Sequence, residues 1–196
     1  MTRTCVALIR GINVGKAKRV PMADLRAAFE RLGFENVRTL LNSGNVVFTA
    51  ALSPKTAAAR IERALEKDIG VPARALVLTA DELEEAVSGN GLTRFAANPS
   101  RLLVGFLWEP AALLEPLGKR DWGNEALELG RQAAYLWCPE GFETPLVKAF
   151  QQAAGTGVTI RNWSTVLKLQ ALVQEPGPAA GPRRRAAPRK RKTSRR

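Results

Sequence analysis

Two short segments place polar side chains beside glycines at the ends of apolar runs. The first, RGINVGK at residues 10–16, follows the apolar run at 4–9, and the second, NSGN at 42–45, separates two further apolar runs. Glycines next to Asn, Ser, Arg and Lys allow the backbone to approach a polar, anionic partner closely. The sequence therefore predicts a binding site, but it indicates no particular reaction.

The first segment and the residues just after it supply several hydrogen-bond donors and no carboxylate. Together with the exposed N–H groups at the start of the following helix, they could hold a phosphate or a carboxylate. The spacing matches neither a Walker loop nor a dinucleotide fingerprint. Two alternatives stay open: the glycines only shape a turn with solvated charges, or the segment contacts a protein. The residues expected to bind an anion here are Arg10, Gly11, Asn13, Gly15, Lys16 and Lys18.

Ser43 and Asn45 in the second segment have two interpretations. Asn, Ser and Gly are typical of a hairpin turn, which explains them without any ligand. They join the predicted anion site only if this turn and the end of the first strand lie at the same end of the sheet. The sequence leaves that placement open.

A third candidate combines a planar cation, an amide and an aromatic ring at Arg161, Asn162 and Trp163. Such a group can bind a base or a phosphate. It can equally lock the final helix onto the sheet, with Trp163 in the core and Ser164 or Thr165 capping the helix, and this second interpretation is favoured. Arg161, with Asn162, is still the addition expected from the second half of the chain to the anion site.

The positive charge of the chain is concentrated at its C-terminal end. Of 30 Lys and Arg residues, nine lie in residues 176–196, which contain no acid, so residues 1–175 hold 21 basic against 18 acidic residues. A Pro-, Ala- and Arg-rich segment cannot bury a core, and we expect it to be disordered and to bind DNA or RNA phosphates without sequence preference. The alternative is a passive solubilising extension. The basic residues are Arg183, Arg184, Arg185, Arg189, Lys190, Arg191, Lys192, Arg195 and Arg196.

The composition argues against several functional classes. The chain has no histidine, which removes the commonest general base and the usual partner of a serine or cysteine nucleophile. Cys5 and Cys138 lie in apolar runs, as buried reduced thiols do, and two cysteines make a zinc site improbable. The carboxylates supply no evident acid–base pair. We therefore expect no metal and no cofactor, and whether the protein is an enzyme stays open.

No stretch approaches the roughly 18 to 20 apolar residues of a membrane span, and no signal-peptide cleavage site follows the N-terminus. We expect a cytoplasmic protein without a membrane partner. The oligomeric state is not indicated.

The apolar periodicity predicts the elements that would position these residues. In the first part we expect strands and helices in the order β-α-β-β-α-β at 4–10, 22–32, 36–41, 45–49, 54–69 and 73–79, then a helix to about 87 opened by a capping box at 79–82. A Gly-, Asn- and Pro-rich joint at 88–100 follows. The second part predicts a β-α-β-β-α order and a further helix at 101–108, 110–117, 125–130, 133–138, 144–154 and 164–173.

These orders predict an α+β fold with two ferredoxin-like (split βαβ) subdomains, the second incomplete or variant, and a disordered basic C-terminal tail. The expected boundaries are 1–88 for the first subdomain with its extra helix, 89–175 for the second, and 176–196 for the tail.

Three ordered motifs carry a resemblance to a known family. ALIRGINVG followed by VPMADLRAAFERLGFENVRTLLNSGNVVF, then YLWCPEGFETPLVKAF, then TIRNWSTVLKLQAL resemble a widespread bacterial family, domain of unknown function 1697. The resemblance covers about residues 3–173 and implies an α+β fold with two ferredoxin-like subdomains. It implies no activity. The chain departs from the family pattern at Lys16, often glycine, at Leu40, often aromatic, and at Ser164, often Asn.

These observations favour a binding module that takes up a small anionic ligand or a nucleotide at the first segment and contacts nucleic acid through its tail. The alternatives are a nucleic-acid-associated protein acting mainly through the tail, and an enzyme on a phosphorylated substrate that uses Lys or Arg for charge stabilisation.

Overall fold

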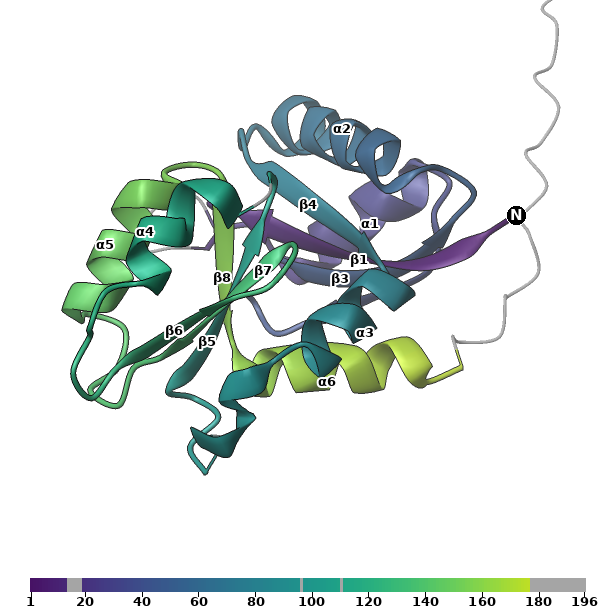
Figure 1. Cartoon of the computed structure of the whole chain (residues 1–196). Coiled ribbons are helices and arrows are strands. Elements are labelled where there is room, and N and C mark those ends of the chain that lie inside the picture. The colour runs from purple at the N-terminus through teal and green to yellow at the C-terminus, as the bar shows by residue number, and fades with distance from the viewer. Residues whose placement is uncertain (14–18, 96, 110, 177–196) are drawn as a thin grey trace, which may run out of the picture.

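The computed structural model describes residues 1–13, 19–95, 97–109 and 111–176. These residues form an α+β fold of two four-stranded antiparallel sheets and six α-helices (Figure 1). The expected basic tail lies outside the described residues from 177 onward, as do Gly15, Lys16 and Lys18 of the first segment.

The first sheet has the strand order β2-β3-β1-β4, so β1 is central and its apolar run is buried on both faces. Three helices accompany it, and α2 continues into a π-helical turn at Leu65–Ile69. Ser53 caps α2, and Thr79 and Glu82 form the expected capping box of α3. The elements are β1 Arg3–Arg10, α1 Met22–Arg31, β2 Glu35–Leu40, β3 Asn45–Ala50, α2 Pro54–Ala64, β4 Arg74–Thr79 and α3 Ala80–Ser88.

The second sheet has the order β6-β7-β5-β8 and contains a strand that the sequence pattern did not predict. This strand, β8, pairs with β5 and is missing from the β-α-β-β-α order expected for the second half, which was wrong at this element. The strand was not recognised because polar Arg161 and Asn162, directly before a helix, interrupt the alternation of apolar and polar residues that is typical of a strand. The elements are β5 Leu102–Leu107, α4 Glu115–Gly118, β6 Ala126–Leu129, β7 Ala133–Trp137, α5 Pro145–Ala154, β8 Val158–Asn162 and α6 Trp163–Gln174, with 3-10 turns at Gly91–Phe95 and Ala111–Leu114.

The apolar side chains form three clusters that alternate with the sheets. Along β1, Cys5 and Ile9 face the cluster under α1 and α2, whereas Val6 and Leu8 face a cluster shared by both sheets. In the shared cluster α3 and α6 lie side by side, as Figure 1 shows, and Trp163 packs there. A third cluster fills the space between the second sheet and α5.

The strand registers bring the candidate residues to one end of the first sheet. Leu8 pairs with Asn45 and Arg10 pairs with Arg74, so the C-terminal end of β1 lies beside both the β2–β3 turn and the start of β4. Strand β8 of the second sheet also contacts β1. Among the described residues, no helix has the length and apolar character needed to cross a bilayer.

Candidate anion-binding site

Arg161 joins the two sheets through its guanidinium group. From β8, its Nε donates to Asn45 Oδ1 at 2.6 Å, and its Nη2 donates to the carbonyl oxygens of Ile9 at 2.9 Å and Ser43 at 3.1 Å. Its Nη1 donates to Thr159 Oγ1 and to the Ile160 carbonyl. These five bonds match the five N–H donors of a guanidinium group, so Arg161 has no donor left for a ligand.

Every acceptor of Arg161 is an uncharged oxygen. Burial lowers the pKa of Arg161 from 12.5 to about 10, which leaves the side chain protonated near neutral pH. Among the described residues no carboxylate lies within 4.0 Å of it. The side chain is therefore a partly buried cation whose charge is not neutralised by an ion pair.

Asn45 lies beneath the surface, with no exposed side-chain area. Its Nδ2 donates to the Leu40 carbonyl and to Ser43 Oγ, while its Oδ1 accepts from Arg161. The amide thus holds the β2–β3 turn in shape and presents one oxygen to the cation.

Gly44 lets this turn approach β1. It has a φ of +74°, and a Cβ there would lie 2.9 Å from the Ile9 carbonyl oxygen and from Ile12 Cδ1. Its own carbonyl accepts from Ile9 N at 2.8 Å. Only glycine combines this left-handed backbone with so close a contact.

Asn13 and Asn162 also use their side chains within the chain. Asn13, with a φ of 56°, donates to the Val20 and Asn42 carbonyls and accepts from Val20 N, which closes the loop between β1 and α1. Asn162 is the N-cap of α6, accepting from Thr165 N at 2.9 Å. The expected cap at Ser164 or Thr165 was therefore wrong, because the cap lies two to three residues earlier.

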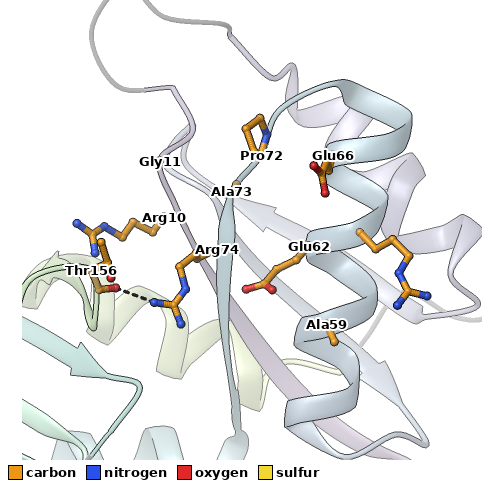
Figure 2. Close-up of a pocket in the computed structure, with 10 residues that line it drawn as sticks. Arg10, Gly11, Ala59, Glu62, Glu66, Pro72, Ala73, Arg74 and Thr156 are labelled. Carbon is orange, nitrogen blue, oxygen red and sulfur yellow. Dashed lines mark hydrogen bonds between the residues drawn. The ribbon is translucent and has the colours of Figure 1, made fainter.

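Two other arginines retain donors. Arg10 Nη1 donates to the Gly155 carbonyl at 3.1 Å and Arg74 Nη1 donates to the Thr156 carbonyl at 3.0 Å, both in the α5–β8 loop. Figure 2 shows the two guanidinium groups lying beside Thr156. The Arg74 guanidinium carbon also lies 4.5 Å from the centre of the Trp108 ring.

Arg74 was not a sequence candidate. It stands at the start of an ordinary strand pattern, and only its register opposite Arg10 places it beside the predicted residues. A split βαβ arrangement places β4 beside β1, so the pairing could have been found by testing which residues oppose Arg10 across those two strands.

Arg10 and Gly11 line two cavities of about 590 Å³ each. One lies between β4 and α2 and is shown in Figure 2, with Arg74, Thr156 and Glu62 on its wall. The other lies against the second half of the chain. Arg10 thus lies between the two cavities, whereas Arg74 lines the one between β4 and α2 and not the other.

Glu62 and Glu66 line the same cavity as these arginines, but no described carboxylate forms an ion pair with either arginine. Glu62 points from α2 toward Arg74 in Figure 2, yet its Oε1 accepts from Ala75 N at 2.9 Å. The ion pairs within 4.0 Å among the described residues involve Arg31, Arg38 and Arg131, and neither Arg10 nor Arg74. Nor do those residues gather three His, Cys, Asp or Glu side chains where they could hold a metal ion.

The predicted residues are thus only partly assembled at one place. Arg10, Gly11, Asn13, Ser43 and Arg161 line one cavity. Asn45 lies beneath it and Asn162 caps α6, so neither exposes a free polar group to it.

Comparison with known proteins gives a family and a fold. The model of the family described as "Protein of unknown function (DUF1697)" matches residues 1–135. A comparison with curated protein sequences finds no match. The solved structure of the conserved bacterial protein SP0830 from Streptococcus pneumoniae is similar, with a TM-score of 0.74 and 24% sequence identity over 89% of this chain and 100% of that chain. This likeness supports the fold, and the family match covers more than half of the chain. The chain therefore belongs to the DUF1697 family, whose function is unknown.

Proposed function

We propose that the protein binds a small oxyanion, such as a phosphate group, between Arg10 and Arg74. The observation that carries this proposal is the convergence of three guanidinium groups, Arg10, Arg74 and Arg161, on one region without an ion pair. An anion there would pair with guanidinium groups that form no ion pair among the described residues.

The donor inventory separates the three arginines. All five donors of Arg161 are hydrogen-bonded to oxygens of the chain, so Arg161 would attract an anion through its charge without donating a hydrogen bond to it. Arg10 and Arg74 each make one hydrogen bond among the described residues, which leaves the planar fork of each guanidinium free for bidentate contact. Gly11, next to Arg10, adds an exposed backbone without a side chain.

Direct titration of the chain with inorganic phosphate tests the proposal. We expect Arg10→Gln and Arg74→Gln each to weaken phosphate binding about 10- to 100-fold, because each removes a charge-assisted hydrogen bond. Glutamine retains an amide that can still donate to Gly155 or Thr156, so the melting midpoint should change little. Isothermal titration calorimetry and thermal melting provide the two measurements.

The exposed Arg26 on α1 is the matched control, and Arg26→Gln should leave phosphate affinity unchanged. The proposal is overturned if the Arg10 and Arg74 variants bind phosphate as the unmodified chain does while losing stability. In that case the two arginines serve only to dock the α5–β8 loop onto the first sheet.

A second proposed activity rests on the nine basic residues between 183 and 196. We infer that they bind DNA or RNA phosphates without sequence preference, adding nucleic acid as a partner. If all nine met phosphates, the slope of log affinity against log salt on duplex DNA would be about −8.

We also infer that each half is a ferredoxin-like subdomain, divided near residue 88. The support is the β-α-β-β-α-β order in the first half and the matching strand orders, β2-β3-β1-β4 and β6-β7-β5-β8. On this view the binding region lies where two related sheets meet.

A further inference from the structure

The second cavity at Arg10, which is also lined by Phe142 and Arg161, is larger and more apolar than a phosphate ion alone would need. Its volume of about 590 Å³ falls within the range of roughly 300 to 1,000 Å³ typical of pockets for organic ligands. A phosphate group occupies only a small part of such a space.

The cavity is divided between cationic and apolar surface. Arg10 and Arg161 supply the charge, while the apolar wall comes from both sheets. An amphipathic ligand, with an anionic group at one end and an apolar body at the other, matches this division. The apolar residues are Ile9, Ile12, Val158 and Ile160.

Phe142 supplies an aromatic surface at this cavity. It is 50% exposed, which makes it one of the few large apolar side chains at the surface of the described residues. Among those residues no other aromatic ring stacks on it. An exposed ring on a cavity wall offers a stacking platform for a planar group.

Gln151 on α5 lies on the same cavity wall and is exposed. Its amide carries both a donor and an acceptor, the pair that hydrogen-bonds the edge of a nucleobase. The cavity therefore combines a ring, an amide and guanidinium groups within one space.

We propose that the ligand of this site is a nucleoside monophosphate, with its base against Phe142 and Gln151 and its phosphate at Arg10, the arginine that this cavity shares with the neighbouring cavity lined by Arg74. This inference rests on the anion site proposed above and names the class of its ligand.

The test compares four probes by isothermal titration calorimetry on the full chain: AMP, UMP, ribose 5-phosphate and inorganic phosphate. We expect AMP to bind at least about tenfold more tightly than ribose 5-phosphate, because base stacking adds affinity. Phe142→Ala should remove most of that difference and leave the affinity for inorganic phosphate unchanged. Gln151→Ala should alter the preference between AMP and UMP.

Leu167→Ala is the matched control, since Leu167 is also exposed, at 39%, but lies on α6 away from the cavity lining. Equal affinity for AMP and ribose 5-phosphate, with phosphate still bound, overturns this inference and leaves the anion site standing. AMP affinity unchanged in Phe142→Ala also overturns it. If no probe binds, both the inference and the proposed anion site are wrong.

Discussion

Arg161 and Arg10 line the same cavity but differ in how many of their donors are hydrogen-bonded within the chain. All five donors of Arg161 are bound to oxygens of the chain, whereas Arg10 makes one hydrogen bond among the described residues. Arg161 should therefore act on stability, and Arg10 on binding. The proposal thus assigns two roles to the same residue type, because the surrounding acceptors differ.

Replacing Arg161 should destabilise the fold strongly. Arg161→Met leaves the Ile9 and Ser43 carbonyls and the Asn45 amide oxygen without their donor, and we expect a loss of about 2 to 4 kcal/mol in the free energy of unfolding. Arg161→Lys should recover little of it, because lysine lacks the planar fork. Urea denaturation measures the change, with the exposed Lys168→Met as control. Unchanged stability in Arg161→Met would show that these bonds do not hold the sheets together.

The two buried thiols predict a fall in stability at alkaline pH. Burial raises the pKa of Cys5 from 9.0 to about 11 and that of Cys138 from 9.0 to about 12. The folded chain therefore holds the two thiol protons more tightly than the unfolded chain does. The contribution of the thiols to the free energy of unfolding is complete below pH 9 and is lost as the pH rises toward the folded-state pKa values. Between pH 8 and pH 10 we expect a loss of roughly 1 kcal/mol per thiol.

Urea midpoints of the reduced chain measured across this range provide the test. The Cys5→Ala/Cys138→Ala double variant should show a shallower decline than the unmodified chain. Equal slopes for both would contradict the assignment of the decline to the thiols.

At the scale of elements, the close contact between α5 and β5 fixes where the α5–β8 loop presents its carbonyls. Gly105 in the middle of β5 lies under Phe150 of α5, and a Cβ at Gly105 would meet Phe150 Cζ at 2.6 Å. The absence of a side chain at Gly105 therefore sets how near α5 lies to the sheet. The carbonyls of Gly155 and Thr156 at the end of α5 then reach Arg10 and Arg74.

Gly105→Ala should cost about 1 to 3 kcal/mol of unfolding free energy, because the added methyl group overpacks this contact. Adding Phe150→Leu should recover part of the loss by removing the clashing ring atoms. Chemical denaturation of the single and double variants gives the coupling between the two positions. Strict additivity of the two changes would argue against a direct contact.

Elements with clear periodicity were predicted well from the sequence, and short polar ones were not. The capping box at Thr79 is confirmed, because local hydrogen bonding alone determines it. Strand β8 was missed because its pairing with β5 is a long-range interaction. The register of Arg74 opposite Arg10 was missed for the same reason.

The sequence indicated which polar residues lie near one another, but not the hydrogen bonds that each of them makes. The polar residues at 10–13 and 43–45 do meet at one end of the first sheet, since Leu8 pairs with Asn45. The hydrogen bonds that each of them makes depend on which groups of the second half lie nearby. Asn45, for example, accepts a hydrogen bond from Arg161 of β8, which is 116 residues away in sequence.

At the scale of the whole molecule, the two sheets share one apolar cluster. Val6 and Leu8 of the first sheet and Val104 and Phe106 of the second belong to it, together with Trp163 of α6. The two sheets are therefore expected to unfold together rather than one after the other. Arg10 and Arg74 also reach across to the second half, where they donate to the carbonyls of Gly155 and Thr156.

Deleting residues 177–196 tests folding and the proposed nucleic-acid binding separately. We expect the shortened chain to keep its melting midpoint, because the apolar clusters lie within the preceding residues. We expect it to lose most of the salt-sensitive binding to duplex DNA. Fluorescence anisotropy at several salt concentrations compares the two chains. Equal DNA affinity at the same salt would mean that the folded part, not the tail, makes the contact.

The most direct test of the anion site is a crystal structure of the chain with bound tungstate, an oxyanion that anomalous scattering locates. We expect an anomalous peak between the guanidinium groups of Arg10 and Arg74, with tungstate oxygens about 2.7 to 2.9 Å from their nitrogens. The absence of a peak there, in crystals where tungstate binds elsewhere on the chain, would contradict the proposed site.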